Sequence, residues 1–188
     1  MMFKKNVLFY FFLSAFFCQL VFGAKNPPLA TVTKVDLPRY EGKWYEIARL
    51  PNSFQKKCLL TEANYKKLNN NSIEVINTCI TKSGKLDRIT GVAKIKDQDT
   101  NAKLAVRFNN LIFKIFFFIP SGKYWILQLS SNESGPYEYA VVGDPSRKFL
   151  WVLSRNPTMS ASTYSEILKI SKTQGFAVEK MFLSRELN

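Results

Sequence analysis

Short strand-like segments separated by turn residues follow one another along most of the chain, and this pattern constrains the fold more than any other feature. The eight segments cover residues 44–50, 59–68, 72–80, 89–96, 103–108, 123–129, 137–142 and 149–153. Short runs at this regular spacing are typical of all-β barrels and sandwiches. Eight strands in one domain fit an antiparallel up-and-down barrel, which is just wide enough to hold one small ligand.

One segment near the C-terminus has a helical pattern instead. Ser160 is a candidate N-cap shortly after Pro157, and Gly175 is a candidate stop signal. Four residues between them share one face at spacings of three and four: Tyr164, Ile167, Leu168 and Ser171. We therefore expect one α-helix packed outside the barrel, followed by a short final strand at residues 177–183.

The first 23 residues have the features of a secretory signal peptide. A basic start at Lys4 and Lys5 precedes an apolar run over residues 7–18. This run is shorter than the roughly 20 residues that a membrane-spanning helix needs. The peptidase-site pattern before Ala24 predicts cleavage there, which leaves a mature domain of residues 24–188.

Export sets the expected location of the mature chain. We expect it to be soluble or peripheral, in the periplasm or at the periphery of the outer membrane if the source is bacterial, and secreted otherwise. A lipoprotein signal also ends its apolar run in a cysteine, which here is Cys18. Its peptidase requires a small residue before the cysteine, and Phe17 stands there. No lipid anchor is therefore expected at Cys18.

The composition excludes several kinds of function. The chain has no histidine, which excludes Ser-His-Asp and Cys-His catalysis and every metal site that contains histidine. Its three cysteines lack CxxC spacing and are too few for a zinc cluster. The net charge is +13, but no nucleic-acid-binding motif accompanies it and an exported chain does not meet nucleic acid. The sequence therefore predicts no catalytic residues, no metal and no cofactor.

Two cysteines, Cys58 and Cys79, remain after removal of the signal peptide. An even number in an oxidising compartment favours a disulfide, and two buried free thiols are the alternative. Regular antiparallel pairing about Asn70 would place Cys58 opposite residue 82 and Cys79 opposite residue 61. The bond therefore requires a bulge or a diagonal contact between the strands.

Three motifs carry a family resemblance. The segment GKWYEIAR at residues 42–49 resembles the G-x-W strand of lipocalins, in the form found in apolipoprotein D and the bacterial outer-membrane lipocalins. The segments YAVVGDP at 139–145 and LWVLSRNP at 150–157 resemble the last two strands of the same branch. The T-D-Y often found before the seventh strand is replaced by GPY at 135–137, which affects only the loop.

The ends of such a barrel have different expected roles. Trp44, near the start of the first strand, can plug one end, and Arg155 can lie over its indole as a cation–π lid. We expect both residues to be structural, because a lid at the closed end does not touch a ligand at the open end. Alternation along the first strand places Glu46 on the interior face, where an unpaired carboxylate is costly. Either a bulge turns Glu46 to solvent, or an arginine such as Arg107 or Arg155 pairs with it. We favour the structural ion pair.

The resemblance implies that Trp151 and Tyr65 match ligand-contacting positions. Alternation along the strands adds Phe149, Leu153 and Ala63 to the same inward faces. Gly91 and Ala93 are small residues on one face of the fourth strand, and we expect them to leave volume for a ligand. On the sixth strand, we assign Trp125 to the cavity, although the opposite face, with Tyr124, Ile126 and Gln128, remains an alternative. Ordinary core packing is the alternative for each aromatic residue.

The run at residues 111–119 is unusually apolar, because eight of its nine residues are hydrophobic. In the lipocalin topology this loop lies at the open end of the barrel. It either folds over that end, pairs with another copy in a homodimer, or contacts a membrane. Phe116, Phe117, Phe118 and Lys114 are the candidate membrane contacts.

Taken together, the sequence predicts an exported lipid-binding lipocalin that is not an enzyme. It stores or carries a fatty acid or lysophospholipid in the barrel and serves membrane maintenance. One alternative is an enzyme that acts on a lipid through a free barrel cysteine, since a fold does not determine a function. Another is a carrier of a tetrapyrrole or a carotenoid, which would give the purified protein a visible colour.

Overall fold

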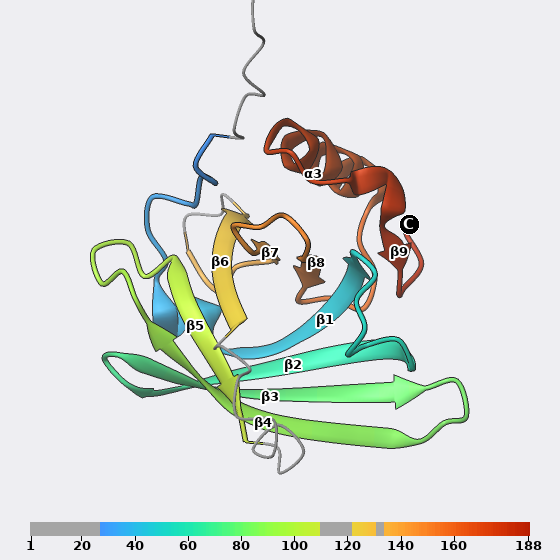
Figure 1. Cartoon of the computed structure of the whole chain (residues 1–188), viewed down its shortest axis with the longest axis horizontal. Coiled ribbons are helices and arrows are strands. Elements are labelled where there is room, and N and C mark those ends of the chain that lie inside the picture. Colours follow the sequence, from blue (N-terminus) through green and yellow to red (C-terminus); the bar gives the residue numbers. More distant parts are fainter. Residues whose placement is uncertain (1–26, 110–121, 131–133) are drawn as a thin grey trace, which may run out of the picture.

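The computed structural model describes residues 27–109, 122–130 and 134–188, and its strands close into an antiparallel barrel (Figure 1). The barrel strands are β1 (Gly42–Arg49), β2 (Cys58–Asn69), β3 (Ser72–Thr81), β4 (Leu86–Ile95), β5 (Lys103–Phe108), β6 (Gly122–Leu129), β7 (Tyr139–Gly143) and β8 (Leu150–Ser154). Neighbours in the chain pair from β2 to β8, and β1 pairs with both β8 and β2. The predicted eight-stranded up-and-down barrel is confirmed, with the short β9 (Phe182–Leu183) as an additional strand beside β1.

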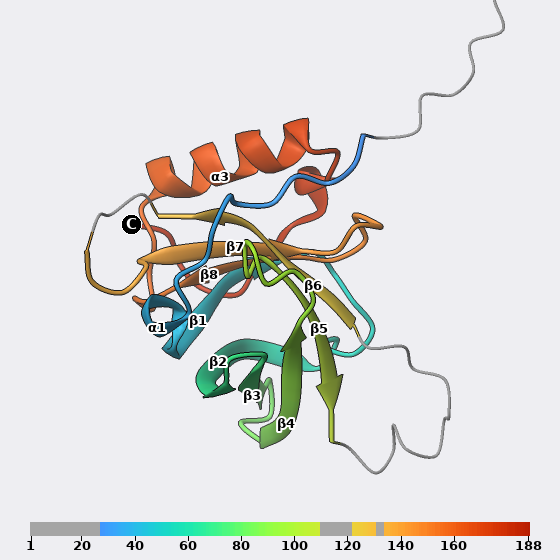
Figure 2. The same ribbon diagram turned by 90° about the vertical axis from the view of Figure 1, so that its left-hand side faces the viewer.

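Alternation along the strands produces two apolar clusters, one inside the barrel and one outside it. Trp44, Val75 and Ile126 belong to the inner cluster. The outer cluster joins strand residues such as Leu127 and Val152 to the helix α3 (Ala161–Thr173). Figure 2 shows α3 lying across this outer face. Where both faces of a strand are covered, as in β6, hydrophobicity alone does not show which side chains point into the barrel.

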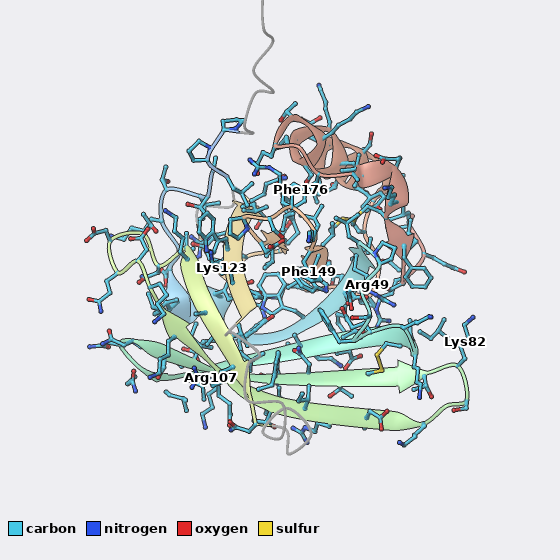
Figure 3. The ribbon with its side chains drawn as sticks, viewed as in Figure 1. Arg49, Lys82, Arg107, Lys123, Phe149 and Phe176 are labelled. Atoms are coloured by element: carbon cyan, nitrogen blue, oxygen red, sulfur yellow. A yellow bond between two sulfur atoms is a disulfide. The ribbon has the colours of Figure 1, made fainter. Side chains whose placement is uncertain are left out.

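The helix was predicted correctly at both ends. The Ser160 side chain accepts a hydrogen bond from the Thr163 amide, as an N-cap should, and Gly175 follows the helix with a positive φ of 88°. Phe176 then turns back under the helix (Figure 3), where its ring fits against Gly143. A Cβ at Gly143 would lie only 2.8 Å from the Phe176 ring, so a glycine is needed for this close approach.

The predicted strand at residues 177–183 is wrong. The chain forms a 3₁₀ turn at Val178–Lys180, and only Phe182–Leu183 pair as β9. Val178 and Met181 are three residues apart, so one turn of 3₁₀ helix places both against the outer cluster. Apolar residues three apart lie on one side of a 3₁₀ turn, whereas apolar residues two apart would have favoured a strand.

The closed end of the barrel has the contact that the sequence predicted. The Arg155 guanidinium lies 3.9 Å from the centre of the Trp44 ring, and Trp44 is fully buried. The same guanidinium donates to the carbonyls of Arg39, Lys43 and Tyr137 at 2.8–3.0 Å. The short helix α1 (Leu37–Tyr40) completes this end, and the Trp44 indole donates to the Tyr40 carbonyl at 2.9 Å.

No helix within the described ranges is long and apolar enough to cross a membrane.

Candidate ligand site in the barrel interior

The barrel interior is tightly packed near α1 and more accessible toward the opposite end, which we call the open end. The β1–β2 segment (residues 50–57) and the β3–β4 turn (82–85) lie side by side there, because Cys58 pairs with Thr81. Phe108, Tyr124 and Trp151 point inward and pack against the inner cluster, yet all three are only partly buried. The exposed part of these rings is available to a ligand. The interior beside these rings is the candidate site.

Three tyrosines from different elements meet inside the barrel. The Tyr124 hydroxyl on β6 lies 2.7 Å from the Tyr40 hydroxyl on α1 and 2.9 Å from the Tyr65 hydroxyl on β2. The Tyr40 ring also packs 5.4 Å from the Tyr65 ring and 5.1 Å from the Trp44 ring. We call these three residues the tyrosine triad, and it lies between the accessible interior and the plug formed by Trp44.

Burial keeps the tyrosine triad neutral. Desolvation raises the pKa of Tyr65 to about 12 and raises the pKa values of Tyr40 and Tyr124 well above their ordinary value. Each hydroxyl therefore keeps its proton at neutral pH, as any tyrosine does, and also at the alkaline pH where an exposed tyrosine would lose it.

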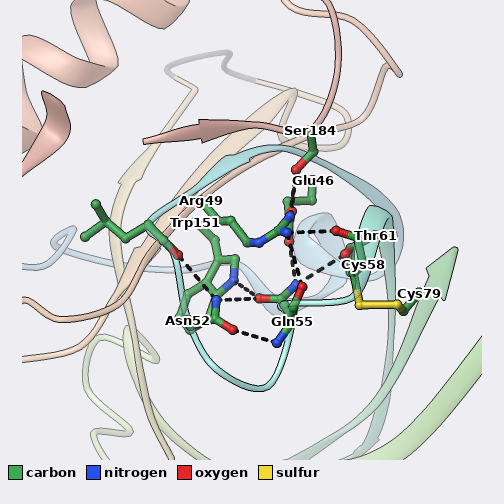
Figure 4. A network of polar contacts seen from close by, with 10 residues as sticks. Glu46, Arg49, Asn52, Gln55, Cys58, Thr61, Cys79, Trp151 and Ser184 are labelled. Carbon is green, nitrogen blue, oxygen red and sulfur yellow. Dashed lines mark hydrogen bonds and ion pairs between the residues drawn. A yellow bond between two sulfur atoms is a disulfide. The ribbon is translucent and has the colours of Figure 1, made fainter. Parts of the chain in front are cut away.

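A second polar cluster centres on Gln55, which extends from the β1–β2 segment toward the interior (Figure 4). Its amide oxygen accepts hydrogen bonds from the Trp151 indole at 2.9 Å and from the Asn52 amide at 2.8 Å. Its amide nitrogen donates to the Glu46 carboxylate at 2.7 Å and to the Thr61 hydroxyl at 3.2 Å. One loop residue thus fixes the Trp151 indole on the barrel wall.

Glu46 faces the interior as predicted, but its partner is Arg49 and not Arg107 or Arg155. Residues three apart in a regular strand point to opposite faces. The pairing of β1 with β8 shifts between Glu46 and Ala48, and this bulge brings Glu46 and Arg49 to the same side. Arg107 is exposed on β5, and Arg155 is occupied at the closed end.

The Glu46–Arg49 pair fills a gap between two strands. β1 pairs with β2 only as far as Tyr45 and then pairs with β9. In this gap Ser184 donates to Glu46 at 2.6 Å, while Arg49 donates to the Cys58 carbonyl at 2.9 Å. Glu46 is only 2% exposed, so a buried charge that would otherwise be costly is fully paired.

The predicted disulfide between Cys58 and Cys79 is confirmed, with a Cα–Cα distance of 5.4 Å. Cys79 lies opposite Thr61, as regular pairing about the β2–β3 turn requires. A register shift between Cys58 and Leu60 brings Cys58 back toward Cys79, so the bulge that the sequence required is present. The bond ties the end of the β1–β2 segment to β3.

The structure brings most of the predicted ligand-contacting residues together on the inner face. Tyr65, Ala63, Ala93, Leu153 and Trp151 all belong to or pack against the inner cluster. The Phe149 ring stacks on Trp151 with a centroid distance of 5.9 Å. The exposed Phe54 ring of the β1–β2 segment lies 5.6 Å from the Phe149 ring. Figure 3 shows Phe149 within the ring of strands.

The assignment of Trp125 to the cavity is wrong. The inward residues of β6 are Tyr124 and Ile126, while Trp125 packs against the outer cluster with the Lys103 ammonium 5.1 Å from its ring. Both faces of β6 are apolar because one faces the interior and the other faces α3. The sequence pattern therefore could not distinguish them.

Gly91 also has a different role from the predicted one. It does not leave volume for a ligand, because a Cβ there would lie 2.7 Å from the Phe108 ring and 2.6 Å from the Arg107 carbonyl oxygen. Gly91 instead allows β5 to approach β4 closely and Phe108 to occupy the space.

Sequence reasoning missed Gln55, Tyr40 and Asn77 as interior polar residues. The buried Asn77 side-chain oxygen on β3 has no hydrogen-bond partner in the described structure. It lies opposite the inward Ala63, on the same face as Val75. A polar residue at an inward position of the strand at 72–80 was the signal that could have identified it.

The predicted membrane contacts Lys114, Phe116, Phe117 and Phe118, and the signal peptide with Cys18, lie outside the described residues.

Comparisons with known proteins agree with this geometry. The family model "Lipocalin-like domain" matches residues 35–185. The chain is 34% identical to apolipoprotein D of Bos taurus, with 87% of this chain and 82% of the relative covered. It is 31% identical to the outer membrane lipoprotein Blc of Escherichia coli (strain K12), with 89% of each covered. The chain belongs to the lipocalin family.

Two further comparisons extend the range of relatives. A putative lipocalin, R877, of Acanthamoeba polyphaga mimivirus is 35% identical, with 86% of this chain and 90% of the relative covered. Insecticyanin from the tobacco hornworm Manduca sexta superposes with a TM-score of 0.61 at 21% identity, with 87% of each chain covered. The second likeness concerns the fold alone.

Proposed function

We propose that this lipocalin is an exported protein that stores or carries an amphiphilic lipid, a fatty acid or a lysophospholipid, in its barrel for membrane maintenance. The observation that carries the proposal is the accessible aromatic wall of Phe108, Phe149 and Trp151 inside the barrel. Such a wall suits an acyl chain, because apolar and aromatic side chains line most small-molecule sites. Family membership supports the binding of a small hydrophobic ligand.

The two ends of the lipid find different surroundings in this arrangement. The accessible interior is apolar, whereas Lys56 and Lys57 are exposed on the β1–β2 segment at the open end. An ionised carboxylate or phosphate is stabilised near these ammonium groups and would be unpaired deeper in the barrel. The polar head of the lipid therefore lies at the open end, with the tail inside.

Tryptophan fluorescence tests the binding site. Addition of palmitate should change the emission of the native protein, and Trp151→Ala should weaken binding about tenfold or more, since a buried aromatic contact is worth roughly 1.5–3 kcal/mol. Trp125→Ala is the matched control, because that indole packs on the outer face. Unchanged palmitate affinity in a folded Trp151→Ala variant would show that Trp151 does not contact the ligand.

We further propose that the open end docks on a membrane, so that lipid enters the barrel without crossing water. Exposed apolar side chains at this end support it: Phe54 is 58% exposed and Leu86 is 62% exposed. Lys82 and Lys85, in the neighbouring turn, are exposed beside them. Apolar side chains next to cations suit an anionic lipid surface.

Vesicle co-sedimentation tests the docking. The double variant Phe117→Ser, Phe118→Ser and the single variant Phe54→Ser should each bind anionic vesicles more weakly than the native protein, and the remaining binding should decline with salt. Leu68→Ser is the control, because Leu68 is 51% exposed but lies at the opposite end of β2. Equal binding by all variants would show that lipid reaches the barrel another way.

An enzymatic role through a barrel thiol finds no support in the described cysteines. Cys58 and Cys79 are joined to each other, so neither offers a free thiolate. Titration of the mature protein with a thiol reagent is the check, and two reactive thiols would revive the enzymatic alternative.

A further inference from the structure

The tyrosine triad contains one hydroxyl proton more than its own hydrogen bonds can use. Each of its three hydroxyls carries one proton, and two hydrogen bonds join them through Tyr124. Whichever way these bonds point, one O–H remains without an acceptor within the triad. Within the described part of the chain, the three hydroxyl groups form no other hydrogen bond.

A buried donor without an acceptor is costly, so an acceptor is expected beside the triad. The triad borders the accessible interior, because Tyr124 is only partly buried and points inward. A ligand that fills the barrel would bring its innermost atoms to this point.

The charged groups nearest the triad already have partners. The Glu46 carboxylate raises the pKa of Tyr65, although burial is the larger cause, and it is paired with Arg49. Arg155 lies behind Trp44, where three carbonyls hold its guanidinium. A neutral oxygen can accept a hydrogen bond from the remaining O–H without an unpaired charge being buried.

We infer, on the basis of the proposed function, that the tyrosine triad is a binding subsite for a neutral oxygen at the buried end of the lipid, such as a hydroxyl or a carbonyl. The protein then prefers a lipid that is polar at both ends over one that ends in a bare methyl group. Its ionised head group remains at the open end.

Palmitate and ω-hydroxypalmitate form a matched pair of probes, because they differ only at the end that should reach the triad. The native protein should bind ω-hydroxypalmitate at least as tightly as palmitate. A triple variant, Tyr40→Phe, Tyr65→Phe, Tyr124→Phe, should bind ω-hydroxypalmitate about tenfold or more weakly while palmitate affinity stays the same, because burial of an unpaired hydroxyl is unfavourable.

The triple variant is expected to fold, because among the described residues the three hydroxyls bond only to one another and their joint removal leaves no partner unpaired. The double variant Tyr139→Phe, Tyr164→Phe is the control, since both rings lie in the outer cluster. Retained palmitate binding reports that each variant is folded.

The outcomes separate the inference from the proposed function. If the native protein binds ω-hydroxypalmitate tenfold or more weakly than palmitate, the subsite is contradicted even if the triple variant does not fold. Equal losses for both probes in the triple variant would also contradict it, by showing a general packing effect. If neither probe binds the native protein, the proposed function fails and the subsite fails with it.

Discussion

The indole nitrogen of Trp151 donates a 2.9 Å hydrogen bond to the side-chain oxygen of Gln55, across 96 residues of sequence. This bond joins the barrel wall on β8 to the segment between β1 and β2. The same Gln55 amide donates to Glu46, so the segment, the wall and the buried ion pair form one connected network (Figure 4). The ring that we place beside the ligand is therefore held in position by a loop residue.

Replacement of Gln55 tests this network. Gln55→Leu should lower the free energy of unfolding by about 2 kcal/mol or more, because the Trp151 indole and the Glu46 carboxylate each lose a buried partner. Thermal unfolding measures the change. Gln98→Ala removes an exposed amide that bonds only to Asn71 and should change the midpoint little. Equal effects of the two substitutions would contradict the role of Gln55.

Replacement of Arg155 should affect stability and leave ligand affinity unchanged. Arg155→Lys keeps the positive charge but loses the planar fork that donates to three carbonyls over Trp44. We expect a loss of about 2 kcal/mol in the free energy of unfolding. Arg88→Lys, at an exposed position on β4, is the control. A large change in palmitate affinity for folded Arg155→Lys would show that the closed end takes part in binding.

Removal of the disulfide should lower stability by about 3 kcal/mol, the value expected for a loop of this length on the chain-entropy model. Urea unfolding of Cys58→Ser, Cys79→Ser measures the loss. Treatment of the native protein with a reductant should produce the same destabilisation and should have no effect on the double variant. A reductant effect on the double variant would point to another cause.

The buried tyrosines predict a specific loss of stability at alkaline pH. The pKa of Tyr65 is about 12 in the folded chain and about 10 when unfolded. Above pH ~10 the unfolded chain loses this proton while the folded chain keeps it, so the stabilisation is complete below pH ~10 and is lost as the pH rises toward about 12. The free energy of unfolding of Tyr65→Phe should therefore decline less between about pH 9 and pH 11. Parallel declines in both proteins would contradict the assignment.

The sequence predicted the fold well because apolar and polar residues alternate clearly in a strand that has one face toward the interior and the other toward water. β2 and β3 are of this kind, and their register follows the turn between them apart from the bulge at Cys58. Errors arose where that condition fails. β6 is covered on both faces, which reversed the assignment of Trp125. The bulge after Glu46 brings Arg49 to the same side, so the predicted partners Arg107 and Arg155 were wrong.

The polar parts of the site were less predictable, because they depend on contacts between distant segments. Nothing near Gln55 in the sequence shows that its amide meets Trp151 and Glu46. The tyrosine triad likewise combines residues 40, 65 and 124 from three separate elements. These residues meet only when the barrel closes, and no local pattern in the sequence indicates which distant side chains then come into contact.

Photolabelling tests the central claim, that lipid binds inside the barrel beside Trp151, most directly. A fatty acid that carries a diazirine in its acyl chain is bound to the mature protein and irradiated, and the labelled residues are identified by mass spectrometry. The account predicts labels on the inward residues Phe108, Tyr124 and Trp151, which excess palmitate should abolish. Labels on the outer residues Trp125 or Leu168, with the inward residues unlabelled, would contradict it.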